Sequence, residues 1–380
     1  MTAKLDQTCS MVARPKEFQF LAQRSFTVAE GLAAGATRSH LRDAGLAMPS
    51  RGIRVPRGRQ QSLLERVRPY TVLCPDACVS HVTAAQLHGM PLPWFDDKIT
   101  RIHLTRPAQS PQPRRQNVVG HTNSLDPGDI MYIGGVPVTT PARTFLDLCA
   151  LLDLDDLVAV ADFLICAHNR SFEPPKEPLI PAPALRAYVA GRRRIRGLTA
   201  ARAAMELMRI GVDSPRETRL RLNLHRAGLP EFTTNYSIPG DPLVWPDLAC
   251  EEYKTSAQYE GEIHKTTQKQ LYDRNRDERT AARGWLQVKV YNADMRKGDA
   301  YVVEMFKRAL RRQGWPGQRP APNQPRIRRS RRAGGGGTAL ASWTSSNFMV
   351  TAPVRVVMVT DTVSREVSSP SASVRPPSIL

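Results

Sequence analysis

The chain has 380 residues, of which 41% are hydrophobic and 23% charged, and 54 Lys and Arg against 35 Asp and Glu give a formal net charge of +19. At roughly 150 residues per domain, this length predicts two or three domains. No apolar run approaches the roughly 18 residues of a membrane helix, and the N-terminus lacks the apolar segment of a secretory signal. We therefore expect a cytoplasmic protein that does not associate with a membrane.

The positive charge is shared between the body of the chain and its C-terminal end. Residues 311–380 contain eleven Arg and two acidic residues, a net charge of +9, which leaves +10 on residues 1–310. A basic body favours a polyanionic partner, most often nucleic acid, and a codon bias toward Arg is the alternative explanation. The six cysteines show neither disulfide nor zinc-site spacing, so we expect reduced thiols.

Residues 18–60 have the pattern of a small helical unit that ends in a strand. Thr27 and Glu30 form a capping-box pattern at the start of a first helix, and a second helix is expected over 39–44. The basic segment 51–57 alternates like a strand. Helix, turn, helix and basic strand predict a DNA-binding winged helix, with a generic helical hairpin as the alternative. The side chains that such a unit would offer to DNA are Arg38, His40, Arg42 and Arg54.

Residues 61–168 are expected to form an α/β extension of this unit. A helix over 79–89 ends at a glycine and is followed by an alternating strand over 100–105. The segment 136–147 then leads from a strand into a helix that Thr140 caps.

A proline-rich linker is expected to separate the two halves of the chain. Five prolines between Glu173 and Pro183 favour extended backbone, so we place a domain boundary within 169–196. The second compact unit, 197–312, has predicted helices over 197–209, 214–227, 266–283 and 298–312 and predicted strands near 233–238, 243–250, 253–260 and 286–292. Residues 317–380 show no periodicity and are predicted to be a disordered basic tail.

The C-terminal unit carries the residues best suited to chemistry. Asp247 is expected at the end of an apolar strand, before a hairpin turn at Glu251 and Glu252. Gln258 and Glu260 lie two residues apart on the next strand and therefore share one face. An acid and two polar groups that converge in this way suit Mg²⁺ or Mn²⁺, because such ions take oxygen ligands and leave positions for phosphate and water.

Several short motifs in this unit resemble one known family. They are Pro246-Asp247, AQYEGEIH over 257–264, DRNRDER over 273–279 and GWLQVKV over 284–290. In this order they resemble the uncharacterised domains related to the very-short-patch mismatch-repair endonuclease, in the PD-(D/E)XK superfamily, over about residues 210–295. The resemblance implies a restriction-endonuclease-like central sheet flanked by helices. It also implies a site acid from an N-terminal helix, and Glu217 is the matching position.

Two positions depart from the family pattern. Gln258 stands where many members have an acid, and Glu260 stands where the superfamily has a lysine. A Gln carbonyl ligates a cation but brings no charge, which weakens the expected metal site. These departures favour a function in which the nuclease fold serves only as a scaffold.

The N-terminal half resembles a second family. The motifs are FTVAE over 26–30, SHVTAA over 80–85 and VTTPARTFLD over 138–147. They resemble the AbiEi-type antitoxin-like proteins common in actinobacteria, over about residues 18–165. This resemblance implies a winged helix that binds DNA, placed ahead of an endonuclease-like domain.

Together these patterns predict a metal-dependent DNA endonuclease. Its expected metal ligands are Asp247, Gln258 and Glu260. His264 is expected to act as acid or base, Glu217 to add a further acid, and Arg276 to face the phosphate. The alternative is a non-catalytic, antitoxin-like DNA-binding regulator. A third class is an antitoxin that binds a toxin-like protein partner.

Simpler structural roles remain open for several of these residues. Glu217 with Ser214 forms a plain capping box, and Asp247 after a proline suits a turn. His264 could cap the following helix, and Arg276 could pair with an acid one turn away on that helix. His81 is expected to be an N-terminal residue of its helix rather than a catalyst.

Overall fold

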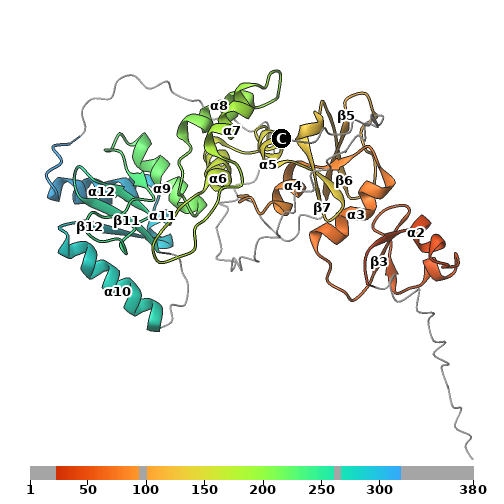
Figure 1. Ribbon diagram of the computed structural model, residues 1–380, viewed down its shortest axis with the longest axis horizontal. Helices are drawn as coiled ribbons and strands as arrows, with labels where there is room; N and C mark the ends of the chain where they lie inside the picture. Colours follow the sequence, from red (N-terminus) through yellow and green to blue (C-terminus); the bar gives the residue numbers. More distant parts are fainter. Residues whose placement is uncertain (1–22, 94–100, 261–266, 318–380) are drawn as a thin grey trace, which may run out of the picture. The chain divides into compact units, whose positions relative to one another are not determined.

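The computed structural model describes residues 23–93, 101–260 and 267–317, with 267–273 as backbone only (Figure 1). Within these residues, helices alternate with strands that form three sheets, so the predicted α/β class is confirmed. None of the helices in the described ranges combines the length and apolar character that a membrane crossing requires. The cysteines in these ranges are all free thiols, as expected.

The first sheet belongs to the N-terminal unit and has the strand order β1-β3-β2. Its elements are β1 (Phe26–Thr27), α2 (Val28–Ala33), the 3₁₀ turn η1 (His40–Arg42), β2 (Leu46–Ala47) and β3 (Ile53–Pro56). The predicted capping box is confirmed, because Thr27 accepts from the Glu30 amide and Glu30 accepts from the Thr27 amide. The second helix predicted over 39–44 is a single 3₁₀ turn. It ends where the Asp43 carboxylate accepts a 2.7 Å hydrogen bond from the Gly45 amide.

The second sheet has the strand order β6-β5-β4-β8-β7. Its strands are β4 (Cys78–Val79), β5 (Ile102–Pro107), β6 (Val118–Asn123), β7 (Ile130–Ile133) and β8 (Val136–Thr139). The associated helices are α3 (Leu63–Leu73), α4 (His81–Leu87), the 3₁₀ turn η2 (Pro127–Asp129) and α5 (Pro141–Leu148). Thr140 caps α5 as predicted, and His81 is the first residue of α4.

A helical layer follows, composed of α6 (Leu154–Ile165), α7 (Ala182–Ala190), α8 (Leu198–Leu207) and α9 (Pro215–Arg226). The segment 169–196, predicted to be a linker, contains α7, whose Leu185 and Val189 are buried in the same hydrophobic cluster as α6 and α8. The prolines do not prevent this helix, because Pro181 precedes it and Pro183 lies in its first turn. The part of the segment that forms α7 is therefore packed against the helical layer, while residues 169–181 before it contain no helix.

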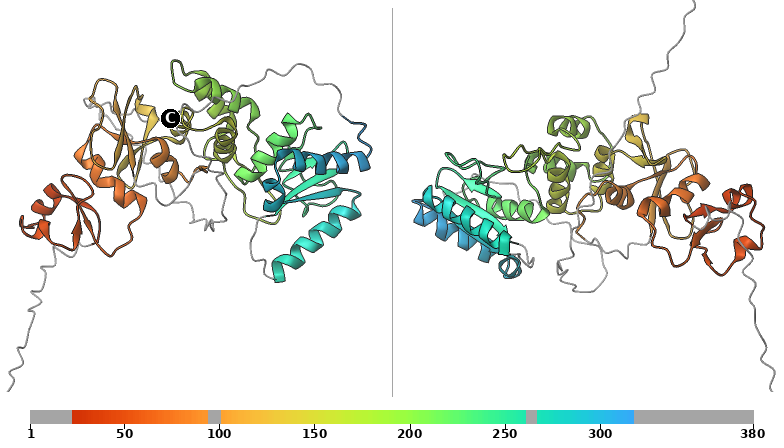
Figure 2. Two further views of the ribbon diagram at one scale, coloured as in Figure 1. Left: turned by 180° about the vertical axis from the view of Figure 1, so that it is seen from behind. Right: turned by 60° about the horizontal axis from the view of Figure 1, so that its bottom comes forward.

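The third sheet has the strand order β12-β11-β10-β9. Its elements are β9 (Thr233–Thr234), β10 (Leu248–Cys250), β11 (Thr255–Glu260), α10 (Thr267–Ala282), β12 (Leu286–Tyr291), α11 (Asn292–Arg296) and α12 (Asp299–Arg312). Figures 1 and 2 show α10 on one side of this sheet and α9 and α12 on the other. β11 and β12 are parallel, and α10 is the crossover between them.

The core of this unit lies between the sheet and α9 with α12. Ala257, Val288 and Val290 from the strands pack with Leu220 of α9 and Phe306 of α12. The opposite face of β11 and β12 is polar and meets α10. The four helices predicted here are confirmed as α8, α9, α10 and α12.

Two predicted strands of this unit are shorter than expected. The strand predicted over 233–238 ends after Thr234, where Asn235 takes a left-handed backbone with φ of 52°. The strand predicted over 243–250 is limited to Leu248–Cys250, because Pro242 and Pro246 have no amide to donate. Residues 318–380, which include the predicted tail, lie outside the described residues.

Candidate metal centre

The hairpin of β10 and β11 brings Asp247 to Gln258. Leu248 pairs with Ala257, so Asp247 lies just before β10 and opposite Gln258. Its Oδ1 accepts a 2.8 Å hydrogen bond from Gln258 Nε2, and its Oδ2 accepts a 2.6 Å hydrogen bond from the Tyr259 amide. Asp247 thus begins a strand rather than ending one, which corrects the prediction. Its carboxylate is nevertheless fixed beside the predicted ligand Gln258.

Gln258 and Glu260 point to the same face of β11, as the strand alternation predicts. This is the polar face that meets α10, because the alternating residues Ala257 and Tyr259 pack in or against the hydrophobic cluster on the other side. Gln258 Oε1 is buried and has no hydrogen-bond partner among the described residues. A buried carbonyl oxygen without a donor is costly to leave in that state, and a bound cation would satisfy it.

Glu260 is 7% exposed and contacts the guanidinium group of Arg276 on α10. Arg276 Nη2 donates to Glu260 Oε1 at 3.4 Å, and the same nitrogen lies 3.8 Å from Asp277 Oδ1. The Arg276 side chain is 13% exposed, so it lies largely inside the protein. The structure therefore places this guanidinium among the acids Glu217, Asp247 and Glu260, here called the carboxylate cluster, in contact with the predicted ligand Glu260.

Lys289 is a polar residue of this face that the sequence analysis did not single out. It pairs in register with Gln258 across the parallel strands β11 and β12, and its ammonium group bonds Asp277 of α10. The alternation of Gln287, Lys289 and Tyr291 indicates a polar face on β12. Only the parallel register shows that this face continues the face of Gln258.

Glu217 is buried in the first turn of α9. Its Oε1 accepts a 2.7 Å hydrogen bond from the Ser214 hydroxyl, and its Oε2 accepts one of 3.1 Å from the Asp213 amide. Burial, reinforced by the negative charge of Asp247, raises the pKa of Glu217 to about 8. The carboxyl therefore helps to close the start of α9 and also lies near enough to Asp247 to interact electrostatically.

Burial also raises the pKa of Asp247 to about 6, although the Tyr259 amide and the Arg276 charge oppose this shift. Two neighbouring acids that both resist ionisation indicate a site where burial disfavours the charged form of each carboxyl. A divalent cation would reverse these shifts, because it favours the ionised form of each carboxylate.

The other predicted site residues have different positions. His264 lies in 261–266, outside the described residues, so its predicted role as acid or base stays a prediction. Arg38, His40 and Arg42 are exposed around η1. Arg54 is half-buried and donates to the Leu41 carbonyl at 2.5 Å and to the Ile53 carbonyl at 2.9 Å, which holds η1 against β3.

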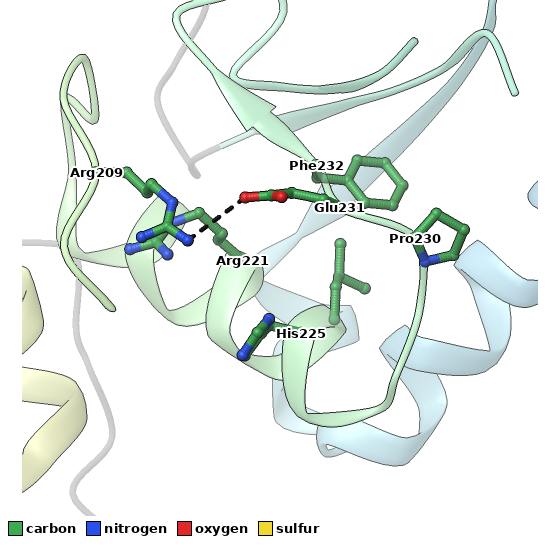
Figure 3. A pocket seen from close by; sticks show the side chains of 7 residues that line it. Arg209, Arg221, His225, Pro230, Glu231 and Phe232 are labelled. Atoms are coloured by element: carbon green, nitrogen blue, oxygen red, sulfur yellow. Dashed lines mark hydrogen bonds and ion pairs between the residues drawn. The ribbon is translucent and has the colours of Figure 1, made fainter. Parts of the chain in front are cut away.

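A small recess beside α9 contains none of these residues (Figure 3). Arg209, Arg221 and His225 line it together with Glu231. Arg209 pairs with Glu231 at 3.4 Å, and Arg221 bonds the buried Asp162 at 2.9 Å. These cations have acidic partners within the protein, so the recess is a structural feature rather than a second candidate site.

Comparison with known proteins gives no match: no family model matches the chain, and no curated protein or solved structure is significantly similar to it. The two resemblances inferred from motifs therefore stay predictions. The geometry of the carboxylate cluster is the basis for the functional argument.

Proposed function

We propose that the chain is a metal-dependent DNA endonuclease that hydrolyses phosphodiester bonds. The observation that supports this most directly is the convergence of Asp247, Gln258 and Glu260 on one polar face, with the unpartnered Gln258 carbonyl among them. In this proposal the N-terminal unit is a winged helix that binds DNA. The exposed Arg38 and Arg42 are its proposed phosphate contacts.

The donor set fits Mg²⁺ or Mn²⁺. Asp247 and Glu260 offer carboxylate oxygens and Gln258 offers a carbonyl oxygen, which are the ligands that hard divalent cations prefer. When bound, such a cation polarises a phosphate and lowers the pKa of a bound water. The Tyr259 amide orients the Asp247 carboxylate for this role through its 2.6 Å hydrogen bond.

Two further groups near the proposed ligands have proposed roles. Glu217 of α9, whose pKa is about 8 without metal, loses its proton when a cation binds and is then the proposed further acid of the site. Lys289 stands beside Gln258 on the neighbouring strand. We assign to it the role of the superfamily lysine that is missing at position 260, namely to stabilise negative charge on the reacting phosphate.

The test is nicking of supercoiled plasmid by the full-length chain in Mg²⁺ or Mn²⁺. The expected result is nicking that EDTA and Asp247→Asn both abolish. The control Glu252→Gln, an exposed acid of the β10–β11 turn, should nick like the wild type. Wild-type rates in Asp247→Asn would remove the proposed site.

The second candidate function is a non-catalytic DNA-binding regulator of the antitoxin-like class. One observation favours it: the Arg276 guanidinium already contacts Glu260, and Gln258 Nε2 already bonds Asp247. Such internal pairing is what a fold retained as a scaffold would show. Salt-dependent DNA binding without cleavage in either metal would support this function over the nuclease.

A further inference from the structure

A cluster of three histidines lies on the second sheet, apart from the carboxylate cluster. His103 on β5 and His121 on β6 share one face, because β5 and β6 are parallel and Thr105 pairs with His121. His81 opens α4 and joins them. One ligand nitrogen from each of the three rings lies within 4.8 Å of the others. We propose that His81, His103 and His121 bind a divalent transition metal ion of the Zn²⁺ type.

The nitrogen spacing suits such an ion. His103 Nδ1 and His121 Nε2 are 3.1 Å apart. In a tetrahedral site with Zn–N bonds of about 2.0–2.1 Å, neighbouring ligand nitrogens are about 3.3–3.4 Å apart. The His81 ring stacks on His121 with 3.7 Å between centroids, and one of its nitrogens lies within 4.8 Å of the ligand nitrogens of the other two rings.

The backbone fixes His81 at this place. Its φ of 50° is in the left-handed region, which is uncommon for a residue other than glycine. The preceding Ser80 amide donates to the His103 carbonyl at 3.1 Å, which ties the start of α4 to β5. An unfavourable conformation held by the surrounding structure is a common feature of functional positions.

Neighbouring side chains orient the His81 ring. The Ser80 hydroxyl lies 2.9 Å from His81 Nδ1, and Asp147 Oδ2 lies 3.8 Å from the same nitrogen. That leaves Nε2 to coordinate. Asp147 is buried, and its Oδ2 has no hydrogen-bond partner among the described residues, while Oδ1 accepts from Arg143. A carboxylate behind a metal-binding histidine is a recurrent arrangement, because it fixes the ring and makes the ligand more basic.

All three side chains are partly exposed, so an ion can reach them. Three neutral imidazoles with one coordination position left are the ligand set of a zinc site that binds an exchangeable water or anion.

A second group of potential ligands shows what an unsuitable site looks like. Cys166, His168 and Asp213 also lie within 4.8 Å of one another. There, however, Asp213 pairs with Arg170 at 2.7 Å and with Lys176 at 2.8 Å. Two cations on the acidic ligand oppose binding of a third. At the histidine cluster, the nearby Arg143 is paired with Asp147 and Asp129.

The test is titration of the full-length, metal-free protein with Co²⁺, which reports tetrahedral nitrogen coordination by its visible absorption. We expect one equivalent of Co²⁺ to bind and Zn²⁺ to displace it, with excess Mg²⁺ having no effect. His103→Gln and His121→Gln should each weaken binding at least 100-fold. The matched control His225→Gln changes an exposed histidine of α9 outside the cluster and should bind like the wild type.

Zinc X-ray absorption on the wild type gives an independent result if a variant does not fold. Nitrogen ligands at about 2.0–2.1 Å without a sulfur shell at about 2.3 Å are expected. A sulfur shell, or binding lost in Cys166→Ser but kept in His103→Gln, would overturn the assignment. So would a folded wild type that binds Co²⁺ no better than its His103→Gln variant. The inference does not rest on the proposed nuclease function.

Discussion

Burial shifts pKa values in opposite directions in the two clusters. It raises those of the carboxylate cluster of the third sheet and lowers those of the histidine cluster of the second sheet. Burial raises the pKa of Glu217 and Asp247, so these acids keep their protons to a higher pH than an exposed carboxyl does. Burial lowers the pKa of His81 and His103, so these rings lose them. In both places the protein disfavours the charged form, because each polar cluster is packed away from water.

The difference between the two clusters lies in the ion that each suits. The carboxylate cluster offers carboxylate and carbonyl oxygen ligands, which suit Mg²⁺ or Mn²⁺. The histidine cluster offers neutral nitrogen ligands, which suit Zn²⁺ or Co²⁺. The two proposals can therefore be separated by the choice of metal and of variant.

The largest effect is expected in Asp247→Asn, which should lose nicking activity and keep its binding of Co²⁺. Asp247→Asn removes a metal oxygen while keeping the size of the side chain, so we expect nicking in Mg²⁺ to fall about 100-fold or more. The same variant should keep wild-type Co²⁺ absorption, because its change lies in the other cluster. Single-turnover nicking and Co²⁺ titration on one protein preparation measure both. Loss of Co²⁺ binding in Asp247→Asn would mean that the clusters are not independent.

A smaller effect is expected from Asp147→Asn, which removes the carboxylate behind His81 but keeps all three imidazoles. Its loss should weaken Co²⁺ affinity about 10- to 100-fold. Asp129→Asn is the matched control, since Asp129 also pairs with buried Arg143 but makes no ion pair with His81. Equal weakening in both variants would show that Asp147 acts only through Arg143.

A higher affinity for Mg²⁺ is expected in Gln258→Glu, which adds a negative charge beside Asp247. The Mg²⁺ concentration for half-maximal nicking should fall about tenfold, because a charged ligand replaces a neutral one. Without metal, the new carboxylate faces Asp247 Oδ1, now 2.8 Å from Gln258 Nε2, so the melting temperature should fall. Gln116→Glu adds the same charge at an exposed position outside this face and should leave the Mg²⁺ requirement unchanged.

The smallest expected effect is on the pH dependence of stability in metal-free protein. Glu217 has a folded-state pKa of about 8, above the usual value for a carboxyl, so the folded state binds more protons than the unfolded state. Its contribution to stability is complete below the unfolded pKa and is lost as the pH rises through about 8. Glu217→Gln should flatten the decline between pH 6 and 8, by at most about 1.4 kcal/mol per pH unit.

Urea midpoints across this pH range measure the effect, and saturating Mg²⁺ should flatten the wild-type curve in the same way. The histidine cluster gives the opposite sign. Since His81 and His103 have lowered pKa values, their contribution is present above the unfolded pKa and is lost as the pH falls below it. If the stability of the wild type and that of Glu217→Gln change with the same slope between pH 6 and 8, the assignment to Glu217 is contradicted.

Local sequence patterns predicted the elements of the fold well where a cap or a turn residue marks a boundary. Thr27 with Glu30 and Thr140 with the following proline define two helix starts that the structure confirms. The failures occur where tertiary packing decides. The prolines before α7 indicated a linker, but burial of Leu185 and Val189 outweighs that local preference.

The candidate carboxylate site was largely predictable for a related reason. Asp247, Gln258 and Glu260 lie within one hairpin, so their proximity follows from strand alternation and a short turn. Lys289 could not be found in this way, because its position depends on the parallel register of β11 with β12 across a crossover helix. Arg276 was predicted to face phosphate, and only the packing of α10 shows that it contacts Glu260.

Local sequence patterns were enough to predict the α/β class, most helix boundaries and the hairpin that carries Asp247 and Gln258, because these depend on interactions between residues near in the chain. Only the tertiary structure brought His81, His103 and His121 together. They come from a helix start and two strands, and 40 residues separate the first from the last. No local spacing marks such a group, because chain folding rather than periodicity sets the distance between its members.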